Sequence, residues 1–117
     1  MSYMLLIIEP KGQREARTPE EGREAYARMG QFAQSLREQG LLLAADALKH
    51  EAAGARVSVR DGRSRTVDGP FSEAKEMIGG YYLLDCQSLA EAKAIAAECP
   101  AAQWATVEVR EIGTCYE

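Results

Sequence analysis

The stretch of this sequence best suited to chemistry is a stiff acidic turn. Asp68 is followed by Gly69, which permits a positive φ angle, and by Pro70, which fixes its own φ and restricts Gly69. A carboxylate held in such a turn can bind a polar ligand or move a proton. It can equally accept backbone N–H groups in an Asx-turn, which is a purely structural role. The turn pattern by itself favours the structural role, so Asp68 is a catalytic candidate with that alternative beside it.

Beyond the turn, a pair of glycines precedes an apolar strand predicted from Tyr81 to Asp85. Gly79 and Gly80 have no side chain to pack, which indicates the close approach of another group or a β-bulge. Lys75 could hold an anionic ligand, or it could form only a surface ion pair. We therefore predict a small-molecule cleft between the turn and the glycine strand. Its candidate ligand-binding residues are Gly69, Pro70, Phe71, Lys75, Gly80 and Tyr82.

A second carboxylate, Asp46, interrupts an apolar strand predicted over residues 41–48. A carboxylate on a buried strand needs a partner or a function, because burying an unpaired charge is costly. If Asp46 shares a pocket with Asp68, their like charges raise one pKa and create an acid–base pair. If the strand lies at the edge of the sheet, Asp46 points into water instead. Asp46 is therefore the second catalytic candidate, and both placements stay open.

Metal and cofactor motifs are not found in the sequence. His50 is the single histidine, and it lies in a polar segment where we expect it to be solvated. Cys86, Cys99 and Cys115 are widely spaced and form no Cys-x-x-Cys pair, so they give no metal-ligand spacing. There is no Gly-rich phosphate loop and no nucleophile elbow. We expect no metal, no cofactor and no disulfide, with the thiols reduced and mostly packed.

Length and composition predict one soluble domain over residues 1–117, with 46% hydrophobic and 27% charged residues. The formal net charge of −4 argues against nucleic-acid binding, which requires a basic face. The apolar N-terminal segment is too short to span a bilayer and has no basic leader. We expect a cytoplasmic protein that binds neither nucleic acid nor membranes.

The elements that must position these residues alternate between strands and helices. Thr18 and Glu21 form a capping-box pattern around Pro19, and Gly40 is placed to end the helix that follows. The complete prediction is a strand over 3–9, a helix over 18–40, a strand over 41–48, a hairpin with strands 56–60 and 63–67, a strand over 81–85, a helix over 88–99 and a strand over 104–110. This order predicts an α+β, ferredoxin-like β-α-β-(hairpin)-β-α-β sandwich.

The apolar pattern of the central strands predicts a homodimer. The strand over 3–9 is apolar in both of its alternating sets of side chains. Tyr81 and Tyr82 project to opposite faces of the sheet, so one can reach the helices and the other a partner. Two helices cover one face only, and the other would expose a larger apolar patch than soluble monomers tolerate. A second copy related by two-fold symmetry would cover it.

The sequence resembles a known family. Asp68-Gly69-Pro70-Phe71, followed by residues 73–76 and Gly79-Gly80-Tyr81-Tyr82, is similar to the signature of the YCII-related, or DGPF-domain, family. The agreement extends to residues 3–7 and 107–110, and so covers nearly the whole chain. The resemblance implies a small, ferredoxin-like, dimeric α/β fold of mostly unknown function. Enzymatic relatives include a dehydrochlorinase that acts on a chlorinated aromatic ring, with a His–Asp pair proposed to do the chemistry.

Two departures from the family pattern bear on function. The family usually has Gly-Glu-Gly where this chain has Ala45-Asp46-Ala47, and the helix from Thr18 to Gln39 contains no histidine. The His–Asp chemistry therefore cannot be carried over. One hypothesis is a dimer with a small-molecule pocket at the Asp68 turn and acid–base catalysis of the lyase or dehydrochlorinase type. The alternative is a non-catalytic accessory or regulatory dimer linked to sigma-factor signalling, since family members often lie beside genes for alternative sigma factors.

Overall fold

The computed structural model describes residues 2–116, which form an α+β fold as predicted. Three α-helices accompany a four-stranded antiparallel sheet and a separate two-stranded hairpin in this range. In chain order the elements are β1 (Ser2–Pro10), α1 (Gln13–Ala16), α2 (Pro19–Glu38), β2 (Leu42–Ala47), the 3₁₀ turn η1 (Glu51–Ala53), β3 (Ala55–Arg60), β4 (Arg63–Asp68), β5 (Glu76–Asp85), α3 (Leu89–Glu98), the 3₁₀ turn η2 (Pro100–Gln103) and β6 (Thr106–Glu111).

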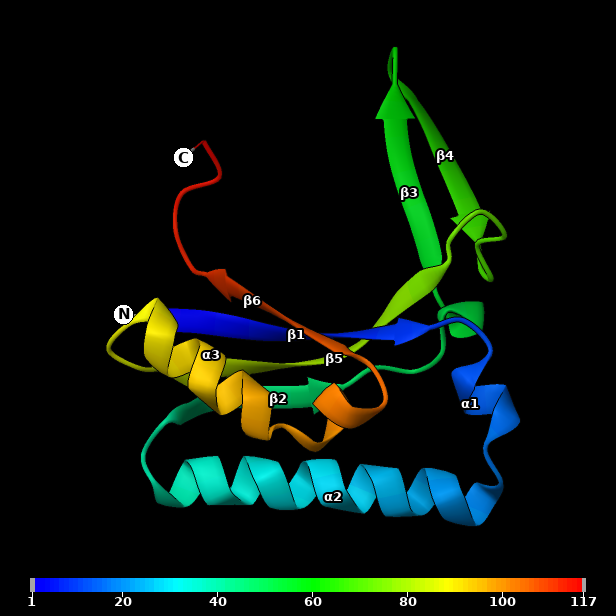
Figure 1. Ribbon diagram of the computed structural model, residues 1–117. Helices are drawn as coiled ribbons and strands as arrows, with labels where there is room; N and C mark the ends of the chain where they lie inside the picture. Colours follow the sequence, from blue (N-terminus) through cyan, green and yellow to red (C-terminus); the bar gives the residue numbers. More distant parts are fainter. Residues whose placement is uncertain (1, 117) are drawn as a thin grey trace.

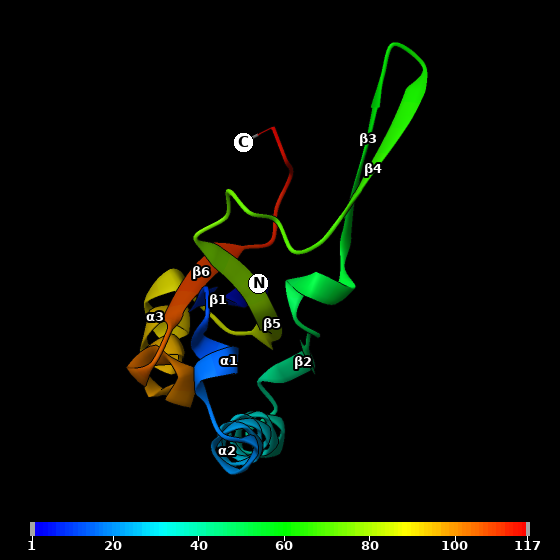
Figure 2. The same ribbon diagram turned by 90° about the vertical axis from the view of Figure 1, so that its right-hand side faces the viewer.

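The four-stranded sheet has the order β2-β5-β1-β6, with every neighbouring pair antiparallel. Both long helices, α2 and α3, lie on one side of this sheet (Figure 1). The β3–β4 hairpin projects away on the other side, as the perpendicular view also shows (Figure 2). No helix within residues 2–116 is long and apolar enough to cross a membrane.

The local signals of α2 are confirmed at both of its ends. The Thr18 side chain accepts a hydrogen bond from the Glu21 N–H, and the Glu21 carboxylate accepts one from the Thr18 N–H, which completes the capping box. At the other end Gly40 has a φ of 73°. The N–H groups of Gly40 and Leu41 bond back to the carbonyls of Arg37 and Leu36, which is the Schellman arrangement.

The β3–β4 hairpin also forms where the sequence predicts it. Asp61 and Gly62 both have positive φ angles, 53° and 73°, as a type I′ turn requires. The register pairs Arg60 with Arg63 and Ala55 with Asp68, so the hairpin is regular along its whole length. Asp68 is thus the last residue of β4 and lies in the small sheet rather than in the central one.

Two parts of the prediction need correction. β5 begins at Glu76 rather than at Tyr81, because its strand pairing continues through the double glycine, with a shift in register opposite Ile7 and Ile8. The predicted bulge is therefore present inside the strand instead of before it. The segment after Gly12 is not a plain loop, since the short helix α1 forms there. Its polar sequence has no apolar period to indicate a helix.

The core lies between the sheet and the helices. Tyr3, Leu5 and Ile7 of β1 are buried on the face that the helices cover, together with Tyr82 and Leu84 of β5. The alternate side chains of β1, which are Met4, Leu6 and Ile8, are only half-buried. The strand is therefore apolar on both faces, as predicted, but this chain covers only one of them.

Candidate functional site

A cavity of about 810 Å³ lies between α2 and the helix-facing side of the sheet. On the helix it is lined by small residues, among them Gly22, Ala25 and Ala33. On the sheet the facing positions are also small, Ala45 in β2 and Gly80 in β5. Larger side chains such as Met29 and Tyr82 also line the cavity, but they leave the space between these small residues open. The cavity therefore follows from small residues meeting small residues across two elements distant in sequence.

The far end of α2 explains why the helix does not collapse onto the sheet. Leu36, in its C-terminal part, is its one buried residue in the described chain. Tyr82 stands between the sheet and the middle of the helix, and its hydroxyl donates to the Met29 carbonyl at 2.9 Å. The Tyr82 ring packs edge-to-face on Phe32, with 5.3 Å between the ring centroids. These contacts fix the distance between the helix and β2. Burial also raises the pKa of the Tyr82 hydroxyl.

A buried ion pair forms one end of the cavity. Glu9 is only 6% exposed, and its two carboxylate oxygens accept from Nε and Nη2 of Arg14 at 2.9 and 2.7 Å. Such a bidentate pair fixes geometry as well as charge. Arg14 also donates from Nη1 to the Leu48 carbonyl at 2.9 Å, and from Nη2 to the Gly79 carbonyl at 3.3 Å. One guanidinium thus joins β1, β5 and the end of β2.

The double glycine is explained by two close approaches. A Cβ atom on Gly79 would lie 1.5 Å from Oε2 of Glu9, so any side chain there would displace the buried carboxylate. A Cβ atom on Gly80 would lie 2.9 Å from the Asp46 carbonyl oxygen. The predicted bulge and the predicted close approach are therefore both present. Each glycine makes room for a specific polar atom.

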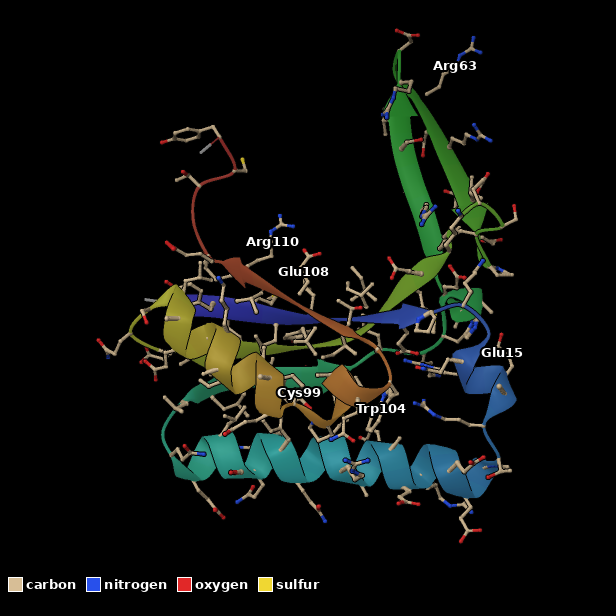
Figure 3. All side chains as sticks on the ribbon, in the orientation of Figure 1. Glu15, Arg63, Cys99, Trp104, Glu108 and Arg110 are labelled. Atoms are coloured by element: carbon tan, nitrogen blue, oxygen red, sulfur yellow. The ribbon has the colours of Figure 1, made fainter. Side chains whose placement is uncertain are left out.

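A tryptophan that two arginines cover also lines the cavity, on the same side as α1. The guanidinium carbons of Arg17 and Arg28 lie 5.5 and 5.0 Å from the centroid of the Trp104 ring. Gln13 donates from its side-chain amide to the Trp104 carbonyl, which ties α1 to this corner. Figure 3 shows Trp104 on the side of the sheet that faces α2, whereas Glu108 and Arg110 of β6 point to the opposite side.

Asp46 lines the cavity, but its carboxylate is directed elsewhere. The register places Asp46 opposite Tyr81, on the alternate face to Ala45 and Ala47. There its Oδ2 accepts a hydrogen bond from the Tyr81 hydroxyl at 3.1 Å, and this bond raises the pKa of Tyr81. β2 is an edge strand and Asp46 is exposed. Of the two placements considered for Asp46, the structure therefore shows the one at the edge of the sheet.

The structure separates Asp68 from the glycine strand. Asp68 is exposed at the end of β4, and neither Asp68 nor Lys75 lines the cavity that Gly80 and Tyr82 line. The expectation of one cleft joining the turn to the glycines is thus corrected. Its physical reason is that the hairpin projects from the open side of the sheet, while the cavity lies on the helix side. A ligand-binding or catalytic role for Asp68 stays a prediction, apart from this cavity.

The remaining turn residues are held by structural contacts. A Cβ atom on Gly69 would lie 1.9 Å from the Glu51 carbonyl, so only glycine fits against η1. Phe71 is nearly buried beneath the Arg56 guanidinium, 3.9 Å from its ring centroid. Lys11 donates to the Phe71 carbonyl at 2.6 Å and pairs with Glu51 at 2.9 Å, and its hydrogen bond lowers the pKa of Glu51.

A second hollow of about 680 Å³ lies between this turn and the hairpin. Pro70 and Phe71 line it, together with Arg56 and Arg65. Two of the predicted ligand-binding residues therefore face this hollow, and two others, Gly80 and Tyr82, face the α2 cavity. The sequence motif is thus divided between two concave surfaces.

The only histidine of the chain is half-buried at the start of η1 rather than fully solvated. Its Nδ1 accepts from the Ala52 N–H at 2.9 Å, and its Nε2 lies 3.3 Å from a carboxylate oxygen of Glu15. His50 does not line the α2 cavity. It therefore acts as a cap for η1.

Sequence reasoning missed most residues of the cavity, among them Glu9, Arg14, Arg17 and Trp104. For Glu9 a signal was present: it continues the alternation of Tyr3, Leu5 and Ile7, which places it on the buried face. The two arginines lie in a polar stretch between β1 and α2, where no pattern distinguishes them from surface charges. Their role depends on contacts with residues far along the chain.

Comparison with known proteins places the whole chain in one group. Residues 1–114 match the YCII-related domain. An uncharacterized protein of Rhizobium meliloti (strain 1021) is 32% identical over 92 residues, which cover 79% of this chain and 74% of that protein.

Proposed function

We propose that this chain, which belongs to the YCII-related domain family, binds a small molecule in the cavity between α2 and the sheet. The relative that it matches is uncharacterized, so the proposal is based on the geometry. The observation that carries the proposal is a preformed space of about 810 Å³. Ligand pockets in proteins usually measure roughly 300–1,000 Å³ and combine apolar walls with a few fixed polar groups. The apolar wall here includes Ile7, Met29 and Tyr82, and the fixed polar group is the Glu9–Arg14 pair.

The contacts around the cavity support binding rather than the His–Asp chemistry of enzymatic relatives. His50 is at η1, and Glu9 is held by two hydrogen bonds from Arg14. Acid–base work by Asp46 or Asp68 would have to occur outside the cavity interior, since Asp46 points to the other face and Asp68 ends β4. Binding is therefore the function that the contacts support best.

The proposal includes a ferredoxin-like homodimer. The strand order β2-β5-β1-β6, with α2 following β1 and α3 following β5, supports this arrangement. The uncovered face of the sheet carries Met4, Leu6 and Ile8, and Ile78 on it is 49% exposed. A second copy packed by two-fold symmetry would bury these side chains.

The projecting hairpin gives further support to the dimer. Val57 and Val59 on β3 are 66% and 58% exposed. A two-stranded hairpin with no other contacts is only marginally stable in water. The radius of gyration is 16.0 Å, whereas a compact chain of this length has about 13 Å. An arm of this kind gains stability when it packs on a partner subunit.

A cavity-filling substitution tests the proposed function. In Gly30→Phe the ring would occupy the cavity, and no atom lies within 4 Å of the added Cβ to oppose it. The matched control is Ala27→Phe, which places the same ring on the exposed side of α2. We expect compounds from a small-molecule thermal-shift screen to stabilise the native protein and the control but not Gly30→Phe. A screen without stabilising compounds, or with compounds that act equally on Gly30→Phe, would contradict the proposal and favour the regulatory alternative.

A further inference from the structure

The charged groups around the α2 cavity do not balance. Five charged side chains line it, which are those of Glu9, Arg14, Arg17, Asp46 and Lys49. Glu9 and Arg14 neutralise each other through their bidentate pair. The carboxylate of Asp46 lies on the opposite face of the sheet, bonded to Tyr81. The cavity is therefore left with the charges of Arg17 and Lys49, both positive.

No carboxylate within residues 2–116 forms an ion pair with either of these two cations. Glu21 does feel the charge of Arg17, but its carboxylate is bound to the Thr18 N–H in the capping box of α2. Acidic residues outnumber basic ones in this chain, which has a net charge of −4, yet no carboxylate within residues 2–116 is paired with Arg17 or Lys49. A bound anion would neutralise the positive charge of Arg17 and Lys49.

Arg17 is available for such an anion. Its planar guanidinium makes a cation–π contact, with the central carbon 5.5 Å from the centroid of the Trp104 ring. The N–H donors around the edge of that plane stay available, and they match a carboxylate in bidentate geometry. The structure shows no hydrogen bond from the Arg17 side chain to another described residue.

Apart from the phenol of Tyr26, which is 70% exposed, the rest of the cavity offers a ligand little that is polar. The Tyr82 hydroxyl already donates to the Met29 carbonyl, and the Thr18 hydroxyl oxygen already accepts from the Glu21 N–H. Ile7, Met29 and Ala33 present only apolar surface. A molecule that fills this space must therefore be apolar over most of its surface and charged at one end.

We infer that the ligand class of this cavity is organic acids, with the carboxylate at Arg17, in the positive field of Lys49, and an apolar body against Ile7, Met29 and Tyr82. This inference rests on the proposed binding function and adds the charge of the ligand to it. The charge follows from the unpaired cations, and the apolar body follows from the apolar side chains of Ile7, Met29 and Ala33.

Three probes of one shape and different charge test the inference by calorimetric titration. They are 2-naphthoate, 2-naphthamide and 2-naphthylmethylammonium. Because a hydrogen bond to a charged group contributes about 1.5–3 kcal/mol, we expect the carboxylate to bind at least about tenfold more tightly than the amide. We expect the ammonium compound to bind most weakly, and added salt to reduce the preference for the carboxylate.

Charge-removing variants locate the preference. Arg17→Gln should lower the affinity for 2-naphthoate about tenfold and leave the affinity for the amide nearly unchanged. Arg23→Gln removes the same charge from the exposed surface of α2, outside the cavity, and should change neither affinity. Circular dichroism of each variant confirms that it is folded.

The outcomes separate the inference from the proposed function. If the amide or the ammonium compound binds as tightly as the carboxylate, and Gly30→Phe still abolishes that binding, the charge assignment is overturned while the cavity remains the binding site. If none of the three probes binds at millimolar concentration, the organic-acid inference is overturned. If probes bind equally well to Gly30→Phe, both the inference and the proposed function are overturned.

Discussion

Gly79 makes room for the carboxylate of Glu9, because a methyl group on residue 79 would lie 1.5 Å from Oε2. The obstructing atom is not a mobile chain end, since Glu9 is buried and held by two hydrogen bonds from Arg14. We predict that Gly79→Ala breaks this pair and lowers the free energy of unfolding by about 3 kcal/mol or more, as the disruption of buried ion pairs usually does. Urea denaturation measures the change.

The control for this prediction is a second glycine-to-alanine change. Gly22 lies in α2, where an added Cβ would meet no atom within 4 Å. Gly22→Ala should therefore raise the free energy of unfolding by up to about 1 kcal/mol, through the better helix propensity of alanine. Equal effects at the two positions would contradict a steric origin for the double glycine.

At the scale of the element, the start of α2 depends on its capping box. The Thr18 hydroxyl accepts from the Glu21 N–H at 3.1 Å. We expect Thr18→Ala to lower the free energy of unfolding by about 1 kcal/mol, the usual effect of losing an N-cap, and Thr18→Ser to change it little. If alanine and serine destabilise equally, the hydroxyl is not the stabilising group. Since Thr18 also lines the cavity, the same denaturation curves should be recorded without ligand.

The capping box of α2 also predicts how the stability of the fold depends on pH. Hydrogen bonds from the Thr18 N–H and within the box lower the pKa of Glu21. A depressed carboxyl pKa stabilises the fold at neutral pH, and this contribution is lost as the pH falls through the pKa of Glu21. An NMR titration of the Glu21 side chain should therefore show a pKa below the ordinary value of glutamate, and a normal value would contradict the capping geometry.

At the scale of the whole molecule, the uncovered face of the sheet determines the assembly we propose. Leu6 lies in the middle of β1, opposite Tyr81 on one side and Glu108 on the other. We predict that the native protein sediments as a dimer at micromolar concentration. Leu6→Glu should shift it to a monomer, because the new charges of both subunits would be buried at the interface. Ala27→Glu, on the exposed side of α2, should leave the dimer intact. A native protein that sediments only as a monomer would disprove the dimer.

The sequence by itself determined the features that have a strong signal among neighbouring residues. The capping box at Thr18, the glycine that ends α2 and the turn at Asp61-Gly62 are each decided within a few positions, so their residue types are sufficient to predict them. Apolar side chains on both faces of a strand likewise predicted which strands are central, because the two faces alternate along the local sequence.

The location of the cavity was decided only by the tertiary structure. A cavity depends on the distance between α2 and β2, which Tyr82 and Leu36 fix through contacts with residues far along the chain. The same holds for Arg14, whose partners belong to three different segments, and for Asp68, which the projecting hairpin carries away from the glycines it precedes in sequence. Local patterns specify elements, whereas the space between elements depends on how all of them pack together.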